Sequence, residues 1–514
     1  MADTAKNTLP TNVGELQRRV SSLEDQDISL RVENLSLRNE IKMLREERRL
    51  WFLEKYGPKS EKLSEDQLNL FQGEPSVHQQ EIENEAELPE EEKSPKVPTK
   101  GKKRPGRTLL PDHLPRVEEI IPCDADQCSC ARCGEEKAVI GYDTSEQLDV
   151  EPAKYFVKVT KREKRSCSKC PGKGISSAPL PPRILPKGKF SDRVILDIVL
   201  GKYRDHLPLH RQQGILLAEA GIEVSRSTLC NQITQVGSLC QSINAAMKKE
   251  LFSTGYVQAD ETPVGLQSKE TKGRNALGWF WEYSHPKGPV LFEFKKSRGR
   301  EGPLKYLEGY KGLLQSDGYA GYNKLSEKDI IRIGCMAHVR RKFEAARKLA
   351  PEDPHPREIL KIISKLYALE KQWREHGLTS EARQEQRALH SQPIMDELKA
   401  KFIATRKRVL PASALGKACD YGMNQWIHVE NYVKHGQVEI DNNWCENAIR
   451  PIAIGRKNWL HIGSREAGER IAPIISIIET CRRMGINVRN YFADVLPGLG
   501  ERPQSDLANL TPAA

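Results

Sequence analysis

The chain is 514 residues long, which exceeds one ordinary hydrophobic core and, at about 100 to 200 residues per domain, predicts three or four units. With 81 Lys and Arg against 70 Asp and Glu, its net charge of +11 favours a polyanionic partner such as nucleic acid. It has no run of about 18 apolar residues, and its polar N-terminus lacks the apolar segment of a signal peptide. We therefore expect a cytoplasmic protein without a membrane span.

Leucines recur every seven residues near the N-terminus, which is the pattern of a coiled coil. The seam consists of Leu16, Leu23, Leu30, Leu37 and Leu44, with Val20 and Ile41 beside them. Asp27 and Asn34 also fall on the seam, so the coil should be weak alone but defined in register. Residues 1–56 are predicted to form a dimerisation helix; an amphipathic helix packed on its own chain is the alternative.

Residues 57–107 pass from an acidic run into a Lys- and Pro-rich one, which is the composition of a linker. The next segment, 108–180, contains two C-x2-C pairs: Cys130 with Cys133, and Cys167 with Cys170. Four thiolates on tight turns can hold a tetrahedral structural Zn²⁺ ion. Cys123 and Cys128 leave one ligand choice open, and a strand is predicted around Tyr155, Val157 and Val159.

Residues 181–250 read as helices. An amphipathic helix stops at Gly221, and the next helix starts with Ser225 or Ser227 as its cap. Helix, short turn and helix is the layout of a helix-turn-helix, which would place Arg226 and Asn231 at the end that contacts DNA. A plain pair of packed helices fits the pattern equally well.

Two aspartates are predicted on strands of the following region. In GYVQADETP, apolar and polar residues alternate, so Asp260 projects from one face of a strand. Residues 276–296 read as two strands around a turn, a helix is expected near 302–310, and the strand GLLQS leads to Asp317. We expect Asp260 and Asp317 to meet in one sheet.

A third carboxylate, Glu446, lies in EIDNNWCENAIRPIAIGRKNWL, ahead of three cations. These cations are Arg450, Arg456 and Lys457. Before it come a strand in DIIRIGC, a basic helix in MAHVRRKFEAARKLA, and helices over 355–437 without a clear catalytic cluster. One interpretation is a capping box of Asn443 and Glu446. The other is that Glu446 binds a metal ion while the cations bind a phosphate backbone.

Strands bearing Asp at the sheet centre, followed by a helix bearing Glu, form the layout of the RNase H-like fold. The segments DETP, SDGYAGY, GCMAHVRRKF and DNNWCENAIRPIAIGRKNWLHIGS, with the cysteine pairs and KYRDHLPLHRQ, closely resemble the insertion sequence 66 family of transposases. The resemblance implies a DDE transposase with Asp260, Asp317 and Glu446 as its triad. These carboxylates would hold two Mg²⁺ (or Mn²⁺) ions, since hard cations prefer oxygen ligands.

The expected protein is thus multidomain, with an α/β RNase H-like catalytic domain that carries a helical insertion. A coiled coil, a small zinc-binding β module and a helical DNA-binding module precede this domain. The predicted boundaries are 1–56 for the coiled coil, 57–107 for the linker, 108–180 for the zinc module, 181–250 for the helical module, 251–354 and 438–500 for the catalytic core, 355–437 for the insertion, and 501–514 for the tail.

The resemblance implies a nucleoid-associated enzyme that binds element terminal repeats and target DNA, hydrolyses the flanking phosphodiester and joins the freed 3′ hydroxyl to the target. It also suggests accessory proteins of the same element and a homodimer or higher oligomer. A zinc-dependent DNA-binding regulator with a non-catalytic RNase H-like domain is the alternative, and a nuclease or resolvase of the same fold is a third. Cys335 and His338 show a C-x2-H spacing similar to one in some transposases, for which a packing or helix-start role fits equally well.

Overall fold

The structure is a computed structural model of the chain. It describes residues 12–56, 111–124, 128, 132, 135–137, 139–150, 153–166, 175–267, 275–327 and 329–514. The chain forms two compact units, one of Met1–Leu88 with Pro179–Ala514 and one of Pro89–Ala178. None of the helices in the described part combines the length and apolar character needed to cross a bilayer. The predicted linker 57–107 lies outside the described residues.

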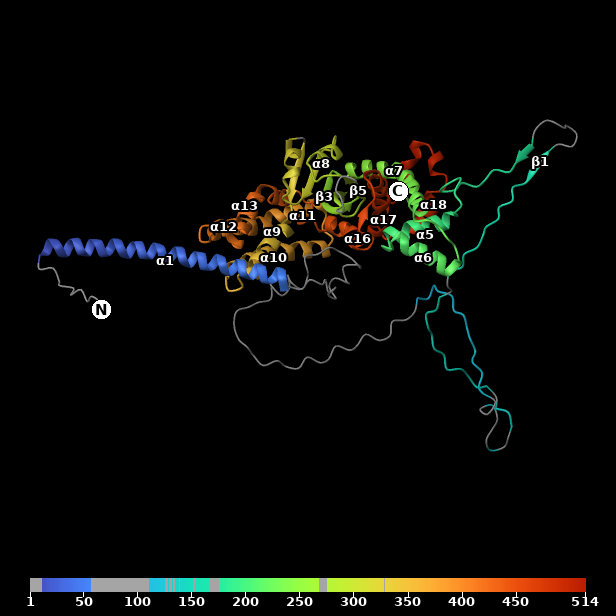
Figure 1. Cartoon of the computed structure of the whole chain (residues 1–514), viewed down its shortest axis with the longest axis horizontal. Coiled ribbons are helices and arrows are strands. Elements are labelled where there is room, and N and C mark those ends of the chain that lie inside the picture. The colour runs from blue at the N-terminus through green and yellow to red at the C-terminus, as the bar shows by residue number, and fades with distance from the viewer. Residues whose placement is uncertain are drawn as a thin grey trace, which may run out of the picture. The chain divides into compact units, whose positions relative to one another are not determined.

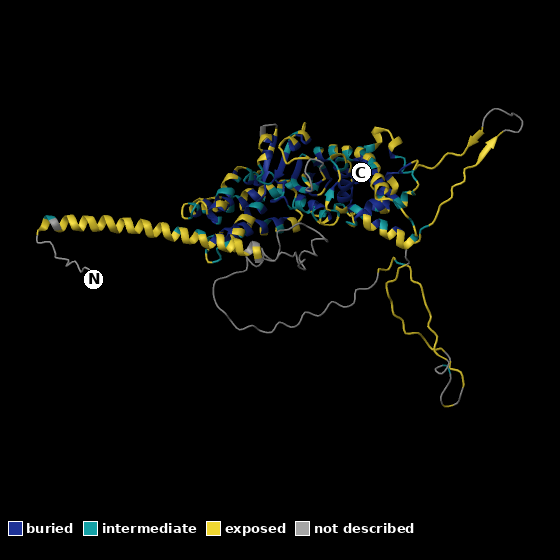
Figure 2. Cartoon of the chain, viewed as in Figure 1, coloured by how far each residue is buried: buried dark blue, intermediate teal, exposed yellow. Residues whose placement is uncertain are grey.

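Helix α1 (Val13–Tyr56) confirms the predicted N-terminal helix (Figure 1). Its heptad leucines, Leu16 to Leu44, are all exposed, with exposed fractions from 40% to 58%. Figure 2 shows this exposure along most of the helix, in contrast to the buried sheet. The described part of this chain therefore does not cover the leucine seam. Such exposure is expected of a coiled-coil seam that pairs with a helix of another chain.

The unit Pro89–Ala178 contains an antiparallel pair of short strands, β1 (Lys164–Ser166) and β2 (Ile175–Ser177). The strand predicted around Tyr155, Val157 and Val159 is wrong, because β1 begins only at Lys164. Val157 and Val159 are strongly exposed. An alternating pattern stabilises a strand by packing on a partly buried surface, and these side chains have none among the described residues.

The helical module consists of α5 (Asp192–Tyr203), α6 (Leu209–Ala220) and α7 (Arg226–Ser253). The predicted stop and start are both confirmed. Gly221 ends α6 in the left-handed region at φ 62°, which glycine adopts without a steric cost. Ser225 Oγ accepts a hydrogen bond from Thr228 N (3.1 Å) and so caps α7.

A mixed sheet forms the centre of the larger unit (Figure 1). Its strands are β3 (Tyr256–Leu266), β4 (Ala276–Ser284), β5 (Val290–Lys295), β6 (Gly312–Ser316), β7 (Ile330–Gly334) and β8 (His461–Ile462). The order is β5-β4-β3-β6-β7, and β8 also pairs with β3. Strands β5, β4 and β3 are antiparallel, whereas β3, β6 and β7 run parallel. β3 is therefore central and almost wholly buried at its start.

Helix α17 (Arg465–Arg483) covers the edge strand β5. Its isoleucines are buried, which confirms the predicted core role of Ile471, Ile474, Ile475 and Ile478. Thr480 Oγ1 accepts from Val290 N (2.9 Å), and Ser476 Oγ accepts from Phe292 N (2.8 Å). Two hydroxyls thus satisfy backbone donors that an exposed edge strand would leave open.

Helices α7 and α17 cross at close range. A Cβ added to Gly237 of α7 would lie 2.1 Å from the carbonyl oxygen of Arg470 in α17. Only glycine permits this approach, because a Cβ would collide with the backbone of α17. The contact joins the helical module to α17, which also packs on β5.

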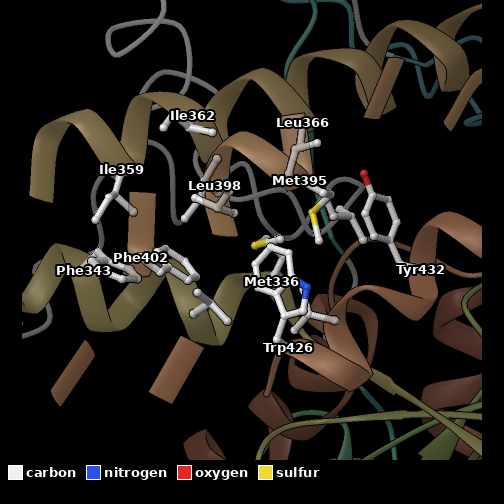
Figure 3. Packing of buried hydrophobic residues seen from close by; sticks show 14 of the residues in the cluster. Met336, Phe343, Ile359, Ile362, Leu366, Met395, Leu398, Phe402, Trp426 and Tyr432 are labelled. Atoms are coloured by element: carbon white, nitrogen blue, oxygen red, sulfur yellow. The ribbon is translucent and has the colours of Figure 1, made fainter. Parts of the chain in front are cut away.

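The predicted helical segment 355–437 is confirmed as helical and packs on α9 (Met336–Leu349). Its elements are α10 (His355–Glu375), α11 (Ser380–Gln386), the π-helix η2 (Arg387–Ser391), α12 (Gln392–Arg406), α13 (Ala414–Asn424), α14 (Trp426–Val429) and α15 (Asn431–Lys434). In Figure 3, Phe343 of α9 and Phe402 of α12 lie side by side, with ring centroids 5.0 Å apart. The same core includes Tyr256 and Leu313 of the sheet, so the insertion is continuous with it.

The remaining elements complete the larger unit. They are α8 (Glu301–Tyr306), η1 (Ala320–Glu327), α16 (Asn443–Trp459), α18 (Val488–Val495), η3 (Leu499–Glu501) and η4 (Gln504–Leu510). Helix α16 packs on β3 and β4, which brings the segment after the insertion back to the centre of the sheet.

Candidate active site

Strands β3 and β6 carry the two predicted aspartates to matching positions. The strands run parallel, with Gln258 opposite Gln315. Asp260 lies two residues beyond Gln258, and Asp317 lies two residues beyond Gln315, directly after β6. Strand β6 ends at Ser316 whereas β3 continues to Leu266, so Asp317, just after β6, lies level with Asp260 inside β3.

Hydrogen bonds to β3 hold the start of α16, which bears Glu446. Gln258 Nε2 donates to the carbonyl oxygen of Asp441 (3.0 Å). Asn442 Nδ2 donates to the carbonyl oxygen of Ala259 (3.1 Å). Both bonds are buried, so they fix the backbone just before the helix beside the strand that bears Asp260.

The capping-box interpretation of Glu446 is wrong. Helix α16 begins at Asn443, and its cap residue is Asn442, whose side chain makes no capping bond. The Asn442 amide donates to β3 instead. Glu446 Oε2 forms an ion pair with Arg341 of α9, so its side chain faces a neighbouring helix rather than the start of its own.

The charges of Asp317 and Glu446 both act on Asp260. Burial raises the pKa of Asp260 well above its usual range, and the negative charges of Glu261, Glu446 and Asp317 raise it further. The N–H of Glu261 donates to Asp260 Oδ1 (2.8 Å), which opposes this rise only in part. Carboxylates that repel one another in a buried place are stabilised by a divalent cation, for which their oxygens are suitable ligands.

Glu261 is an acidic residue that sequence reasoning missed, although it directly follows Asp260 in DETP. It is almost fully buried and pairs with Arg298, at 2.6 Å between Oε1 and NH2. Tyr322 Oη donates to its other oxygen (3.0 Å). Glu261 is therefore held by an arginine and a tyrosine of the protein itself.

The surroundings of Glu446 include two residues of α9. His338 Nδ1 lies 3.8 Å from Glu446 Oε1, and Arg341 pairs with Oε2. Burial lowers the pKa of His338, against the opposing effect of the Glu446 charge, so the imidazole is neutral near pH 7. Sequence reasoning gave Arg341 no role, because only the packing of α9 against α16 brings it to Glu446.

The predicted phosphate-binding cations differ in their surroundings. Arg450 and Lys457 are exposed, and their spacing of four and eleven residues from Glu446 puts them on its face of α16. Arg456 is turned toward β3, where its NH1 donates to Thr262 Oγ1 (3.2 Å) and to the carbonyl oxygen of Pro263 (2.6 Å). Arg456 thus attaches α16 to the sheet in this structure.

A groove of about 870 Å³ runs beside the start of α7, where DNA contact was predicted. Its walls include Lys187 and Lys189 from the loop before α5, and Asn231 from α7. Arg226 is the first residue of α7, and its side chain is exposed. Gln232 also lines the groove, and its Oε1 has no hydrogen-bond partner within the described part of the chain, although the residue is only 8% exposed. The groove thus offers cations and amides to a ligand.

The predicted zinc ligands Cys130, Cys133, Cys167 and Cys170 lie outside the described residues. Of their neighbours, Cys128 Sγ donates to the carbonyl oxygen of Cys123 (3.5 Å). Cys167 and Cys170 fall in the sequence between β1 and β2.

Comparison with known protein families gives three matches along the chain. Residues 187–470 match the "Transposase IS66 family", residues 127–171 match the "zinc-finger binding domain of transposase IS66", and residues 43–118 match the "Transposase C of IS166 homeodomain". The first match covers the helical module, the sheet and the insertion. The second contains all four predicted zinc ligands.

Curated relatives come from Sinorhizobium fredii (strain NBRC 101917 / NGR234). The uncharacterized protein y4jD is 33% identical over 403 residues, which cover 76% of this chain and 77% of y4jD. The uncharacterized protein y4qI is 30% identical over 480 residues, which cover 89% of this chain and 86% of y4qI. With a transposase match over more than half of its length and a zinc-finger match before it, this multidomain chain belongs to the IS66 family of transposases.

Proposed function

We propose that this protein catalyses Mg²⁺-dependent DNA cleavage and strand transfer, with Asp260, Asp317 and Glu446 as the catalytic triad of an RNase H-like domain. The observation that carries the proposal is that Asp260 lies level with Asp317 on adjacent parallel strands and that the charges of both Asp317 and Glu446 act on it, although 57 and 129 residues separate the three in the sequence. The order β5-β4-β3-β6-β7, with its aspartates at the central strands, supports the RNase H-like interpretation.

The residues present fit a divalent cation. The donors are carboxylate oxygens, the ligands that Mg²⁺ and Mn²⁺ prefer, and the raised pKa of Asp260 reflects burial first and then repulsion by neighbouring carboxylates, both of which such an ion would offset. Bound in a pair, such ions activate the attacking oxygen and stabilise the leaving oxygen of a phosphodiester. Asp260, Asp317 and Glu446 would hold these ions.

The remaining residues bind and orient DNA. Arg450 and Lys457 extend along the Glu446 face of α16, where they would bind the phosphates that flank the scissile bond. Arg456 is a positioning residue in this scheme, since its contacts with Thr262 and Pro263 keep α16 against β3. Cleavage exposes a 3′ hydroxyl, which then attacks a phosphodiester of target DNA.

Recognition of element ends belongs to the modules before the catalytic core. The start of α7, with Arg226 and Asn231, would enter a DNA groove, while Lys187 and Lys189 would contact phosphates. We propose that a structural Zn²⁺ bound by Cys130, Cys133, Cys167 and Cys170 organises the preceding module. Pairing of the exposed α1 seam with a second copy would place two catalytic domains on two DNA ends, in the cytoplasm and with any accessory proteins of the element.

A strand-transfer assay with Mg²⁺ and DNA carrying element ends tests this proposal. Asp260→Asn should abolish joint products while end binding in a gel-shift assay is retained. Asp396→Asn, an exposed acid of the insertion, is the matched control and should transfer like the wild type. Unaltered transfer by Asp260→Asn would refute the triad, and cleavage without joints in the wild type would point to a nuclease.

A further inference from the structure

A cysteine, a histidine and the proposed third catalytic acid form a cluster at two helix starts. Atoms of Cys335, His338 and Glu446 that can bind a metal all lie within 4.8 Å of one another. Cys335 is the cap residue of α9 and His338 lies in the first turn of that helix, whereas Glu446 lies in the first turn of α16. The cluster thus depends on the packing of the two helices.

Two atoms of this cluster are buried without a hydrogen-bond partner among the described residues. They are His338 Nδ1 and Glu446 Oε1, which lie 3.8 Å apart. Arg341 contacts the other polar atom of each residue. It pairs with Glu446 Oε2, and its NH1 lies 3.3 Å from His338 Nε2. Buried polar atoms left open in this way indicate a site for a water, an ion or a ligand.

The third member of the cluster is a buried cysteine with a fixed sulfur position. Cys335 is only 4% exposed, and its Sγ accepts a hydrogen bond from the backbone N–H of Asn442 (3.2 Å). Burial raises the pKa of the thiol, and this donor opposes the rise only in part, so coordination to a metal ion is what removes the thiol proton. The donor also fixes the direction of the sulfur, as partners of metal ligands commonly do.

The chemistry of these ligands selects a transition metal over Mg²⁺. Thiolate and imidazole suit Zn²⁺, whereas Mg²⁺ takes oxygen ligands. With bonds of about 2.0 to 2.3 Å, the ligand atoms of a tetrahedral zinc ion are roughly 3.5 Å apart. The 3.8 Å between His338 and Glu446 is close to this value, and all three ligand atoms lie within 4.8 Å of one another.

We propose that Cys335, His338 and Glu446 bind Zn²⁺, and that this ion competes with the catalytic Mg²⁺ for Glu446 and so inhibits strand transfer. On binding, the thiol proton passes to solvent, the Arg341 cation leaves Glu446 and His338, and a water completes the four ligands. Zinc binding is independent of the proposed function, whereas the inhibition rests on it.

Counting zinc in the full-length protein tests the site. Loosely bound metal is removed, and Zn²⁺ is then titrated in competition with a chromophoric chelator. His338→Ala and Cys335→Ser should each bind one zinc ion fewer per chain than the wild type. His390→Ala, which removes an exposed histidine of η2, should bind as many as the wild type. Equal counts in the wild type and His338→Ala would overturn the site.

The competition is tested in strand transfer at fixed Mg²⁺ with added Zn²⁺. The zinc concentration for half inhibition should rise at least about tenfold in His338→Ala, since losing one of three protein ligands weakens a metal site at least as much as losing a supporting contact. Arg341→Gln should lower it, because the competing cation is gone. An unchanged value in His338→Ala would overturn the competition.

The outcomes separate this inference from the proposed function. Strand transfer that persists in Asp260→Asn, together with a zinc count that falls in His338→Ala, would remove the proposed function and leave the zinc site. Loss of transfer in Asp260→Asn, together with equal zinc counts in the wild type and His338→Ala, would support the proposed function and remove the zinc site.

Discussion

Two regions of the larger unit bury charged side chains. One pairs each charge with an opposite charge, whereas the other brings like charges together. In the helical insertion, Arg387 is fully buried against Glu370, with paired bonds of 2.7 and 2.8 Å. Its remaining donors reach the carbonyl oxygens of Tyr432, His435 and Val438. At the sheet, burial raises the pKa of Asp260, and the charges of neighbouring carboxylates raise it further.

The difference separates a structural charge from one suited to binding. A buried ion pair is tolerated only where its partners satisfy every donor and acceptor, as those of Arg387 do. Acids that repel one another destabilise the fold and are retained where an external cation completes them.

Replacing Asp260 by Asn should separate activity from stability. We expect strand transfer to fall by on the order of 10³-fold or more, because a metal contact contributes several kcal/mol to the transition state. The melting temperature without Mg²⁺ should rise, since a carboxylate whose pKa is raised by the fold destabilises the folded state when charged. A fall in the melting temperature would contradict the contrast.

Replacing Arg387 by Met should lower the stability of the fold. It leaves the Glu370 carboxylate buried without its partner, which costs about 3–5 kcal/mol of unfolding free energy. Urea denaturation would measure this loss. Arg374→Met, at a half-exposed arginine of α10, serves as control and should cost far less.

Glu282 of β4 is a buried acid with a weaker ion pair than that of Glu370, because Arg483 NH2 lies 4.0 Å from Glu282 Oε1. Burial raises its pKa to about 7, and the Arg483 charge offsets this only in part. The folded state therefore holds the proton more tightly than the unfolded chain. Stability from this group is full below about pH 4.5 and is lost as the pH rises toward 7.

Glu282→Gln should remove that pH dependence. The shift from 4.5 to about 7 corresponds to about 3 kcal/mol as an upper bound. Urea denaturation at several pH values between 4.5 and 8 would measure the change, with wild type and variant compared at each. Asp441, whose pKa is also raised to about 7 by burial, acts in the same pH range and stays in both proteins. Parallel curves for the two proteins would refute the role of Glu282.

Adding Mg²⁺ should stabilise the wild type and not Asp260→Asn. Ligand at about 100 times its dissociation constant adds about 2.7 kcal/mol to the unfolding free energy. Thermal melting with and without Mg²⁺ measures the effect, and Asp396→Asn should respond like the wild type. An equal response in Asp260→Asn would place the ion elsewhere.

The smallest effect is expected for Arg341→Gln. Arg341 is half exposed, so its ion pair with Glu446 contributes under about 1 kcal/mol to stability. Its removal should nevertheless tighten Mg²⁺ binding, because the cation no longer competes for Glu446. Isothermal calorimetry would measure the affinity, and Arg347→Gln, on the same helix and paired with Glu344, is the control.

Local patterns predicted most elements of the fold correctly. Gly221 and Ser225 marked the end of α6 and the start of α7 because helix ends depend on neighbouring residues. The failures had a tertiary cause. The alternation at Val157 and Val159 found no surface to pack on, and Asn442 and Asn443 gave no capping box because the Asn442 amide bonds to β3.

Sequence patterns were enough to predict candidate residues for the chemistry: Asp260 and Asp317 at strands, Glu446 at a helix start, and paired cysteines before them. Folding of the whole unit was needed to show that Asp260 lies level with Asp317 and that His338, Cys335 and Arg341 reach Glu446. The physical reason is that such contacts depend on strand register and on the packing of α9 against α16. No local propensity encodes the distance between residues a hundred positions apart.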